Sequence, residues 1–88
     1  MTEVKKGSVT VSERGRDKGR IMAVLNVEGR YALVADGRKR KVEKPKRKKL
    51  CHLSLLSDAA IEVEGLTNKA LWKKLEPYRE NDTDSSEA

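Results

Sequence analysis

The stretch "SVTVSERGRDKGRIMAVLNVEG" (residues 8–29) contains two apolar segments separated by a short basic turn. Residues 8–12 alternate Val with Ser and Thr, which is the period of a strand with one buried face. Residues 20–27 are almost continuously apolar, and their short length and β-branched content favour a second strand over a helix. Gly15 and Gly19 supply the turn between them. The stretch therefore predicts two strands joined by a basic loop.

Further short strands follow this pair. Residues 30–36 predict a third strand, and Asp36-Gly37 is a dipeptide typical of tight hairpins. Residues 38–44 would then pair back as a short basic strand. Pro45 limits further ladder pairing, and residues 49–56 resume an apolar pattern. The spacing predicts a mainly β fold, a small barrel or strongly curved sheet of about five short strands.

The pattern changes after Leu56. Residues 67–78 predict a short helix with Thr67 as its N-cap, which Pro77 should end near Glu76. Its apolar face comprises Leu71, Trp72, Leu75 and Tyr78. This face indicates packing on the barrel, and the alternative is docking on another protein. The conformation of residues 57–66 stays open between a helical turn and an edge strand.

The chain has 88 residues and 3% aromatic residues, which predicts one small domain with a core of Val, Leu, Ile and Ala. It has one cysteine, Cys51, whereas small secreted domains usually carry paired cysteines. The longest apolar run is too short to cross a bilayer, and no secretory leader is recognisable. These features predict a cytoplasmic protein with no membrane association. Three parts are expected: a barrel over 1–56, a helical extension over 57–78 and a disordered acidic tail over 79–88.

Positive charge is concentrated in the middle of the chain. The formal net charge is +6, but residues 14–49 carry 14 Lys and Arg against four Asp and Glu, an excess of ten. Residues 76–88 carry one Arg against five Asp and Glu, an excess of four negative charges. Such a basic centre indicates a polyanionic partner. The acidic tail either solubilises the chain or shields the basic centre from unspecific binders.

The turn between the first two strands carries more charge than a turn needs. The cations Arg14, Arg16, Lys18 and Arg20 are predicted to be exposed around its tip. Asp17 would bond to the amides of the loop. A tip of this kind suits a groove lined by phosphates, because an arginine can bind two oxygens at once. The alternative is an ordinary loop with solvated charges.

Residues 7–29 resemble the KOW motif of ribosomal proteins and NusG-type transcription factors. That motif is an alternating apolar strand, a basic turn of the form G-[KR]-[DN]-K-G and a second apolar strand, and Gly19 occupies its hallmark glycine. Together with "VADGRKRKVEKPKRKKLCHL" (34–53), the chain is similar to small bacterial KOW-domain RNA-binding proteins. These resemble the fourteenth large-subunit ribosomal protein of archaea and eukaryotes. The resemblance implies an SH3-like barrel that binds RNA, with large-subunit ribosomal RNA and ribosomal proteins as partners and a ribosome-associated location.

Two groups of residues are the candidates for RNA contact. The turn contributes Arg14, Gly15, Arg16, Lys18, Gly19 and Arg20. The second basic run and its end contribute Arg38, Lys39, Arg40, Lys41, Lys46, Arg47, Lys48, Lys49 and His52. Lys44 to Lys49 are expected in an extended connection around Pro45. A disordered basic linker or localisation signal is the alternative for the second run. The scarcity of aromatics predicts recognition of RNA shape and backbone instead of stacked bases.

Other functional classes find little support in the sequence. Cys51-His52 lacks the further ligands of a zinc site, so no metal or other cofactor is expected. His52 is predicted to be a sheet residue at the edge of the basic patch. No paired carboxylates, phosphate loop or activated nucleophile can be named, which predicts neither an enzyme nor a small-molecule substrate. The alternative to RNA binding is a protein-interaction adaptor that uses the barrel or the C-terminal helix.

Overall fold

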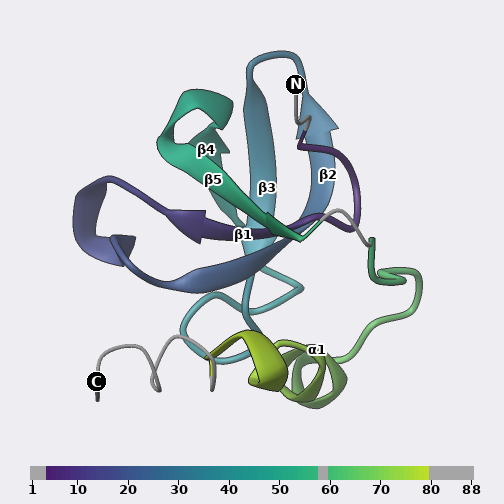
Figure 1. The fold of residues 1–88 in the computed structure, drawn as a ribbon. Coiled ribbons are helices and arrows are strands. Elements are labelled where there is room, and N and C mark those ends of the chain that lie inside the picture. Colours follow the sequence, from purple (N-terminus) through teal and green to yellow (C-terminus); the bar gives the residue numbers. More distant parts are fainter. Residues whose placement is uncertain (1–3, 58–59, 80–88) are drawn as a thin grey trace, which may run out of the picture.

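Strand β2 (Ile21–Glu28) is the element around which the core is built, because its first four residues are buried on both of its faces. The computed structural model describes residues 4–57 and 60–79 (Figure 1). In this part of the chain, five strands form one antiparallel sheet in the order β4-β3-β2-β1-β5. A mainly β domain with a five-stranded sheet and a short C-terminal helix is therefore confirmed. The predicted acidic tail over 79–88 lies outside the described residues except for Arg79.

The sheet pairs sequence-adjacent strands and then adds β5 beside β1. Strand β1 (Val9–Ser12) pairs with β2, and β2 pairs with β3 (Tyr31–Ala35), all antiparallel. Strand β5 (Leu53–Ser57) lies on the other side of β1. The register of β2 against β3 shifts between Val24 and Asn26, and β2 changes direction strongly near its middle (Figure 1). Such a bulge bends the strand that contains it.

Apolar side chains of β2 alternate between two hydrophobic clusters. Met22 and Val24 pack with Ala32, Val34 and Leu53 in one cluster. The other contains Val9, Ile21, Ala23, Ala35, Leu71 and Leu75. Successive strand residues point to opposite faces of a sheet, so the run "IMAV" needs apolar partners on both sides. The continuous apolar pattern of this strand is explained by its burial between two clusters.

The predicted strand over 38–44 is wrong. The segment forms a compact loop, because the carboxylate of Asp36 accepts hydrogen bonds from the backbone amides of Arg38 and Arg40, both at 2.9 Å. Local bonds of this kind compete with a strand ladder. The fourth strand is instead β4 (Lys46–Lys49), which was expected to be an extended connection. Pro45 directly precedes it, where a missing backbone donor costs no ladder bond.

The predicted strand over 49–56 begins later than expected. Leu50–His52 form a 3-10 turn, and β5 starts at Leu53. His52 therefore lies in a turn and is not a sheet residue. Residues 60–63 form neither of the two alternatives left open for 57–66, and a turn follows at Glu64 and Gly65.

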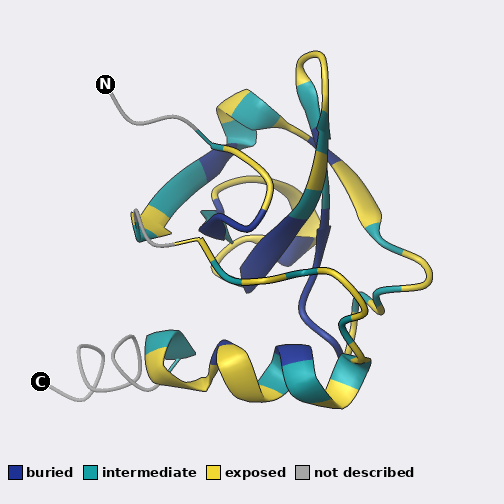
Figure 2. Cartoon of the chain, turned by 90° about the vertical axis from the view of Figure 1, so that its right-hand side faces the viewer, coloured by how far each residue is buried: buried dark blue, intermediate teal, exposed yellow. Residues whose placement is uncertain are grey.

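The C-terminal helix α1 (Asn68–Lys74) packs against the sheet with its apolar face. Its N-cap is confirmed, because Thr67 Oγ1 accepts a hydrogen bond of 3.1 Å from the amide of Ala70. Leu71 and Leu75 are fully buried, and Figure 2 shows the buried residues of the helix on the side that faces the sheet. The helix ends before Glu76, and residues 76–79 are helical again. The packing interpretation of this helix is thus confirmed.

Backbone approaches backbone where the loop after β3 meets α1. Gly37 has a φ of +90°, and a Cβ atom at this position would overlap the carbonyl oxygen of Asn68 and lie 3.0 Å from the amide nitrogen of Trp72. Gly19 has a similar φ of +86° but open space around it. Both positions thus require a positive φ, but only Gly37 packs closely against the backbone of α1.

Substitution of Gly37 by Ala is expected to destabilise the protein more than the same substitution of Gly19. Both variants force an L-residue to positive φ, which costs about 1–2 kcal/mol. Only Gly37→Ala must also displace α1, which adds roughly 1–3 kcal/mol. Chemical denaturation followed by Trp72 fluorescence measures both, and equal losses of stability would contradict the close packing at Gly37.

Candidate nucleic-acid interface

The basic turn is a short 3-10 segment, Gly15–Asp17, followed by a tight return to β2. The amide of Gly19 donates to the carbonyl of Ser12 at 2.8 Å, and the amide of Arg20 donates to the carbonyl of Asp17 at 2.8 Å. Gly15 and Gly19, which were expected to supply the turn, have positive φ values of 79° and 86°. These backbone bonds fix the turn, so that its cations extend from an ordered loop.

The prediction that Asp17 bonds to the amides of its own loop is wrong. Its side chain is 2% exposed, and its Oδ2 accepts a hydrogen bond of 2.9 Å from Arg40 Nη2. The ammonium of Lys48 lies 3.7 Å from the same oxygen, and Arg20 Nε lies 3.8 Å from Oδ1. A buried carboxylate requires such partners, because an uncompensated charge away from water is costly. Asp17 therefore joins the turn to two distant segments.

The second buried carboxylate, Asp36, extends this arrangement. Its Oδ2 accepts a hydrogen bond of 3.1 Å from Arg20 Nη1, while its Oδ1 binds the two backbone amides of the following loop. Arg20 thus contacts both carboxylates, and its side chain is only 34% exposed. The prediction that Arg20 is exposed around the tip is wrong: its side chain is partly buried and holds the turn against the loop after β3.

Lys48 is also an internal cation, for a reason that lies in the sheet register. Lys48 is opposite Ala32 on β3, and Ala32 belongs to a buried cluster. Directly opposed residues share a face, so the Lys48 side chain points inward. Its ammonium donates a hydrogen bond of 2.9 Å to the carbonyl of Arg14 and faces Asp17. Lys48 therefore cannot act as an exposed contact.

The remaining residues of β4 are exposed, and the whole strand borders a concave surface. We call this surface the basic groove. It has a volume of about 430 Å³ and is lined by Gly15, Arg16, Asp17, Tyr31, Arg40, Lys46, Arg47, Lys48, Lys49 and His52. The guanidinium of Arg47 stacks over the Tyr31 ring, 4.1 Å from its centroid. Two cationic segments that are distant in sequence, the turn and β4, thus line one groove.

The candidate residues therefore divide into internal and external cations. The internal ones are Arg20, Arg40 and Lys48, each in an ion pair with a buried carboxylate. The exposed ones are Arg14, Arg16, Lys18, Arg38, Lys39, Lys41, Lys46, Arg47 and Lys49. Of these, Arg38 is turned toward the helix, with its guanidinium 4.3 Å from the centroid of the Trp72 ring. External cations are the ones available to a ligand.

Electrostatics keep Asp17 ionised. Burial alone raises the pKa of Asp17, but the hydrogen bond from Arg40 and the charges of Arg40, Lys48 and Arg20 together lower the pKa below its ordinary value of 3.8. Because the folded pKa is lowered, the ion pairs of Asp17 contribute stability above pH 3.8 that is lost as pH falls through the folded pKa.

The described residues contain no group of three or more His, Cys, Asp and Glu that could hold a metal ion. Cys51 is an exposed free thiol. Within residues 4–57 and 60–79, no helix is both long and apolar enough to span a bilayer.

The carboxylates at the centre of the site were not predicted. Asp17 and Asp36 are two of only four acidic residues in the basic segment 14–49, and each lies within two residues of a turn glycine. Isolated acidic residues in a strongly basic segment indicate internal ion pairs, and this pattern is present in the sequence. Comparison with family models and with curated proteins finds no match to this chain.

Replacing Asp17 by Asn should destabilise the fold by about 3 kcal/mol, the low end for a broken buried ion pair, since Arg40 stays a quarter exposed. The variant should also lose part of the drop in stability that is expected of the wild type as pH falls below 3.8. Urea denaturation at neutral and acidic pH measures both effects.

Glu64→Gln is the matched control, because it makes the same chemical change in an exposed ion pair with Lys6. Its effect on stability should be far smaller. Equal effects of the two variants, or an unchanged pH dependence in Asp17→Asn, would show that the buried network does not hold the turn.

Proposed function

We propose that this protein binds structured RNA through contacts to the phosphate backbone. Ribosomal RNA of the large subunit is the target that the resemblance to small KOW-domain proteins implies. The five-stranded antiparallel sheet is compatible with an SH3-like barrel of the KOW type, and we propose that fold type for residues 8–57. The proposed location is the cytoplasm, in association with ribosomes.

The observation that carries this proposal is the convergence of two cationic segments on the basic groove. Arg16 reaches it from the turn, and Lys46, Arg47 and Lys49 reach it from β4. The segments are held together by the internal ion pairs of Asp17, so their cations are positioned before a ligand arrives. Pre-ordered cations lose less conformational entropy on binding a polyanion.

The groove suits phosphates better than stacked bases. Tyr31, the one Phe, Tyr or Trp residue that lines it, already carries the guanidinium of Arg47 over its ring. The exposed side chains around the groove are Lys and Arg, which bind phosphate oxygens without reading sequence. Recognition of the path of the backbone, and hence of RNA shape, is the mode that these residues support.

A second function, that of a protein adaptor, is favoured by an apolar hollow that shares no lining residue with the basic groove. It is lined mainly by Val4, Val27, Leu50, Leu53 and Leu55. Leu56, which is 44% exposed, is the one exposed large hydrophobic residue of the described part of the chain. Partners that remain bound after ribonuclease treatment would support the adaptor, and partners lost on treatment would support RNA binding.

The double variant Arg16→Ala and Lys18→Ala should weaken binding to a structured ribosomal RNA fragment by at least about tenfold. Both side chains are exposed on the turn, so the fold should be retained. The magnitude of the slope of log affinity against log salt should fall by up to about 2, since each lost phosphate contact contributes about 0.9. Filter binding across a salt series provides both quantities.

The control is the double variant Lys73→Ala and Lys74→Ala, which removes the same charge from exposed positions of α1. It should change affinity much less. An equal loss in both double variants would mean that overall charge, and not the turn, accounts for binding.

Native protein in a cell lysate should sediment with the large ribosomal subunit through a sucrose gradient and remain bound after a moderate salt wash. A specific site on the subunit combines positioned contacts with charge attraction, whereas unspecific binding is lost as salt rises. Recovery only in the light fractions would contradict the ribosomal target while leaving other RNAs open as targets.

A further inference from the structure

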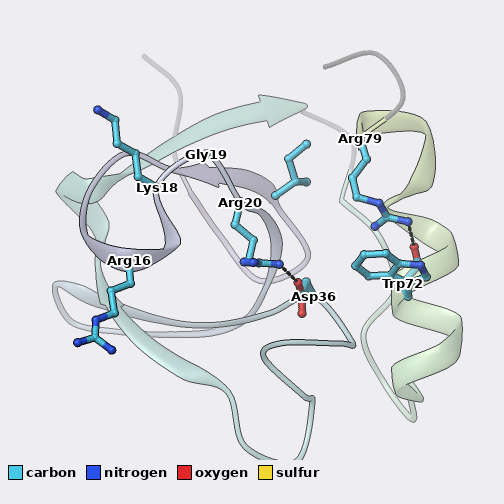
Figure 3. Close-up of a pocket in the computed structure, with 8 residues that line it drawn as sticks. Arg16, Lys18, Gly19, Arg20, Asp36, Trp72 and Arg79 are labelled. Atoms are coloured by element: carbon cyan, nitrogen blue, oxygen red, sulfur yellow. Dashed lines mark hydrogen bonds and ion pairs between the residues drawn. The ribbon is translucent and has the colours of Figure 1, made fainter. Parts of the chain in front are cut away.

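A second concave site lies between the basic turn and the C-terminal helix. Its volume is about 330 Å³, within the range of about 300–1,000 Å³ typical of small-molecule sites. Figure 3 shows the side chains of the turn on one side and those of the helical segment on the other. We call it the helix-side pocket, and it shares Arg16 with the basic groove.

The turn side of the pocket is cationic. Arg16, Lys18 and Arg20 line it, together with Ile21 and Asp36. The one carboxylate among the lining residues does not repel an anion freely, since Asp36 already accepts bonds from Arg20 and from two backbone amides. The pocket therefore favours an anionic ligand.

The helix side of the pocket consists of planar side-chain groups. The Arg79 guanidinium lies over the Trp72 ring, 3.5 Å from its centroid, and Arg79 Nη2 donates a hydrogen bond of 2.9 Å to the carbonyl of Trp72 (Figure 3). The Trp72 ring points from α1 toward the Arg20–Asp36 pair. Planar groups held in this way are surfaces on which a nucleobase can stack.

The cationic wall and the planar wall together match the two halves of a nucleotide, its phosphate and its base. A phosphate alone would be served by the turn cations and would leave the indole–guanidinium wall unused. A base alone would leave the cations unused. Arg16 lines both the basic groove and the helix-side pocket, so a strand whose phosphates follow the groove passes the mouth of the pocket at this residue.

We propose that the helix-side pocket receives one unpaired nucleotide of the bound RNA, with its phosphate at Arg16 and Lys18 and its base against Arg79 and Trp72. The inference rests on the proposed function and adds to it a preference for RNA with a bulged or looped-out nucleotide. The C-terminal helix thereby takes part in binding and does not only complete the core.

The test compares two RNA hairpins of equal length, one fully paired and one with a single bulged nucleotide. The wild-type protein should bind the bulged hairpin about fivefold more tightly or better, the gain expected from stacking one base. Binding of the bulged hairpin should also change the emission of Trp72, the only tryptophan of the chain, more than binding of the paired one.

Arg79→Ala should reduce the preference for the bulged hairpin to nearly one. Arg38→Ala is the matched control, because it also removes a guanidinium stacked on Trp72, but Arg38 lies outside the lining of the pocket. It should weaken both hairpins similarly and retain the preference. Circular dichroism of both variants confirms that the fold is intact.

Tight, salt-dependent binding with no preference for the bulge, or a preference that survives Arg79→Ala, would overturn the assignment of the pocket while the proposed function stands. Absence of binding to either hairpin and to ribosomal RNA would overturn the proposed function, and this inference with it. A free mononucleotide that competes as well as the bulged hairpin would overturn the assignment to an RNA strand.

Discussion

The buried carboxylate of Asp17 is the interaction on which the arrangement of the basic segments depends. It lies in the turn between β1 and β2, yet it pairs with Arg40 from the loop after β3 and approaches Lys48 in β4. Three basic segments would repel one another if brought together without a counter-charge. One negative charge where they meet makes their close approach favourable. Asp36 has the same effect on a single cation, Arg20, with which it forms an ion pair.

The cations of the protein thus have two kinds of role. Those directed inward fix the positions of loops and strands, whereas those directed outward, such as Arg16 and Arg47, are available to a ligand. A count of charges in the sequence cannot separate the two, because both kinds occur in the same runs. The turn "RGRDKGR" contains both kinds within seven residues: Arg16 and Lys18 are exposed, whereas Arg20 is engaged in ion pairs. A ligand therefore meets a surface whose geometry is set before binding.

Much of the fold could be predicted from local sequence, and the predictions that were wrong have physical causes. The alternation of residues 8–12, the apolar run of 20–27 and the cap at Thr67 act locally, so strands β1 and β2 and helix α1 were predicted. The strand expected over 38–44 does not form, because the side chain of Asp36 accepts hydrogen bonds from backbone amides of this segment. This side chain is buried by distant residues, so its role could not be predicted locally. The ion pairs of Asp17 and the stack of Arg79 on Trp72 are likewise tertiary, and no spacing in the sequence specifies them.

Strand β4 has one further consequence, which concerns self-association. Among the described residues it lies at one end of the sheet, with no strand along its outer edge. An unprotected edge can pair with the edge of another copy and begin aggregation. Here the edge starts at a proline and consists of four cations, of which Lys48 points inward, so a second copy would bring like charges together and find no apolar surface. The residues that favour a polyanion thereby also disfavour the protein's own sheet as a partner.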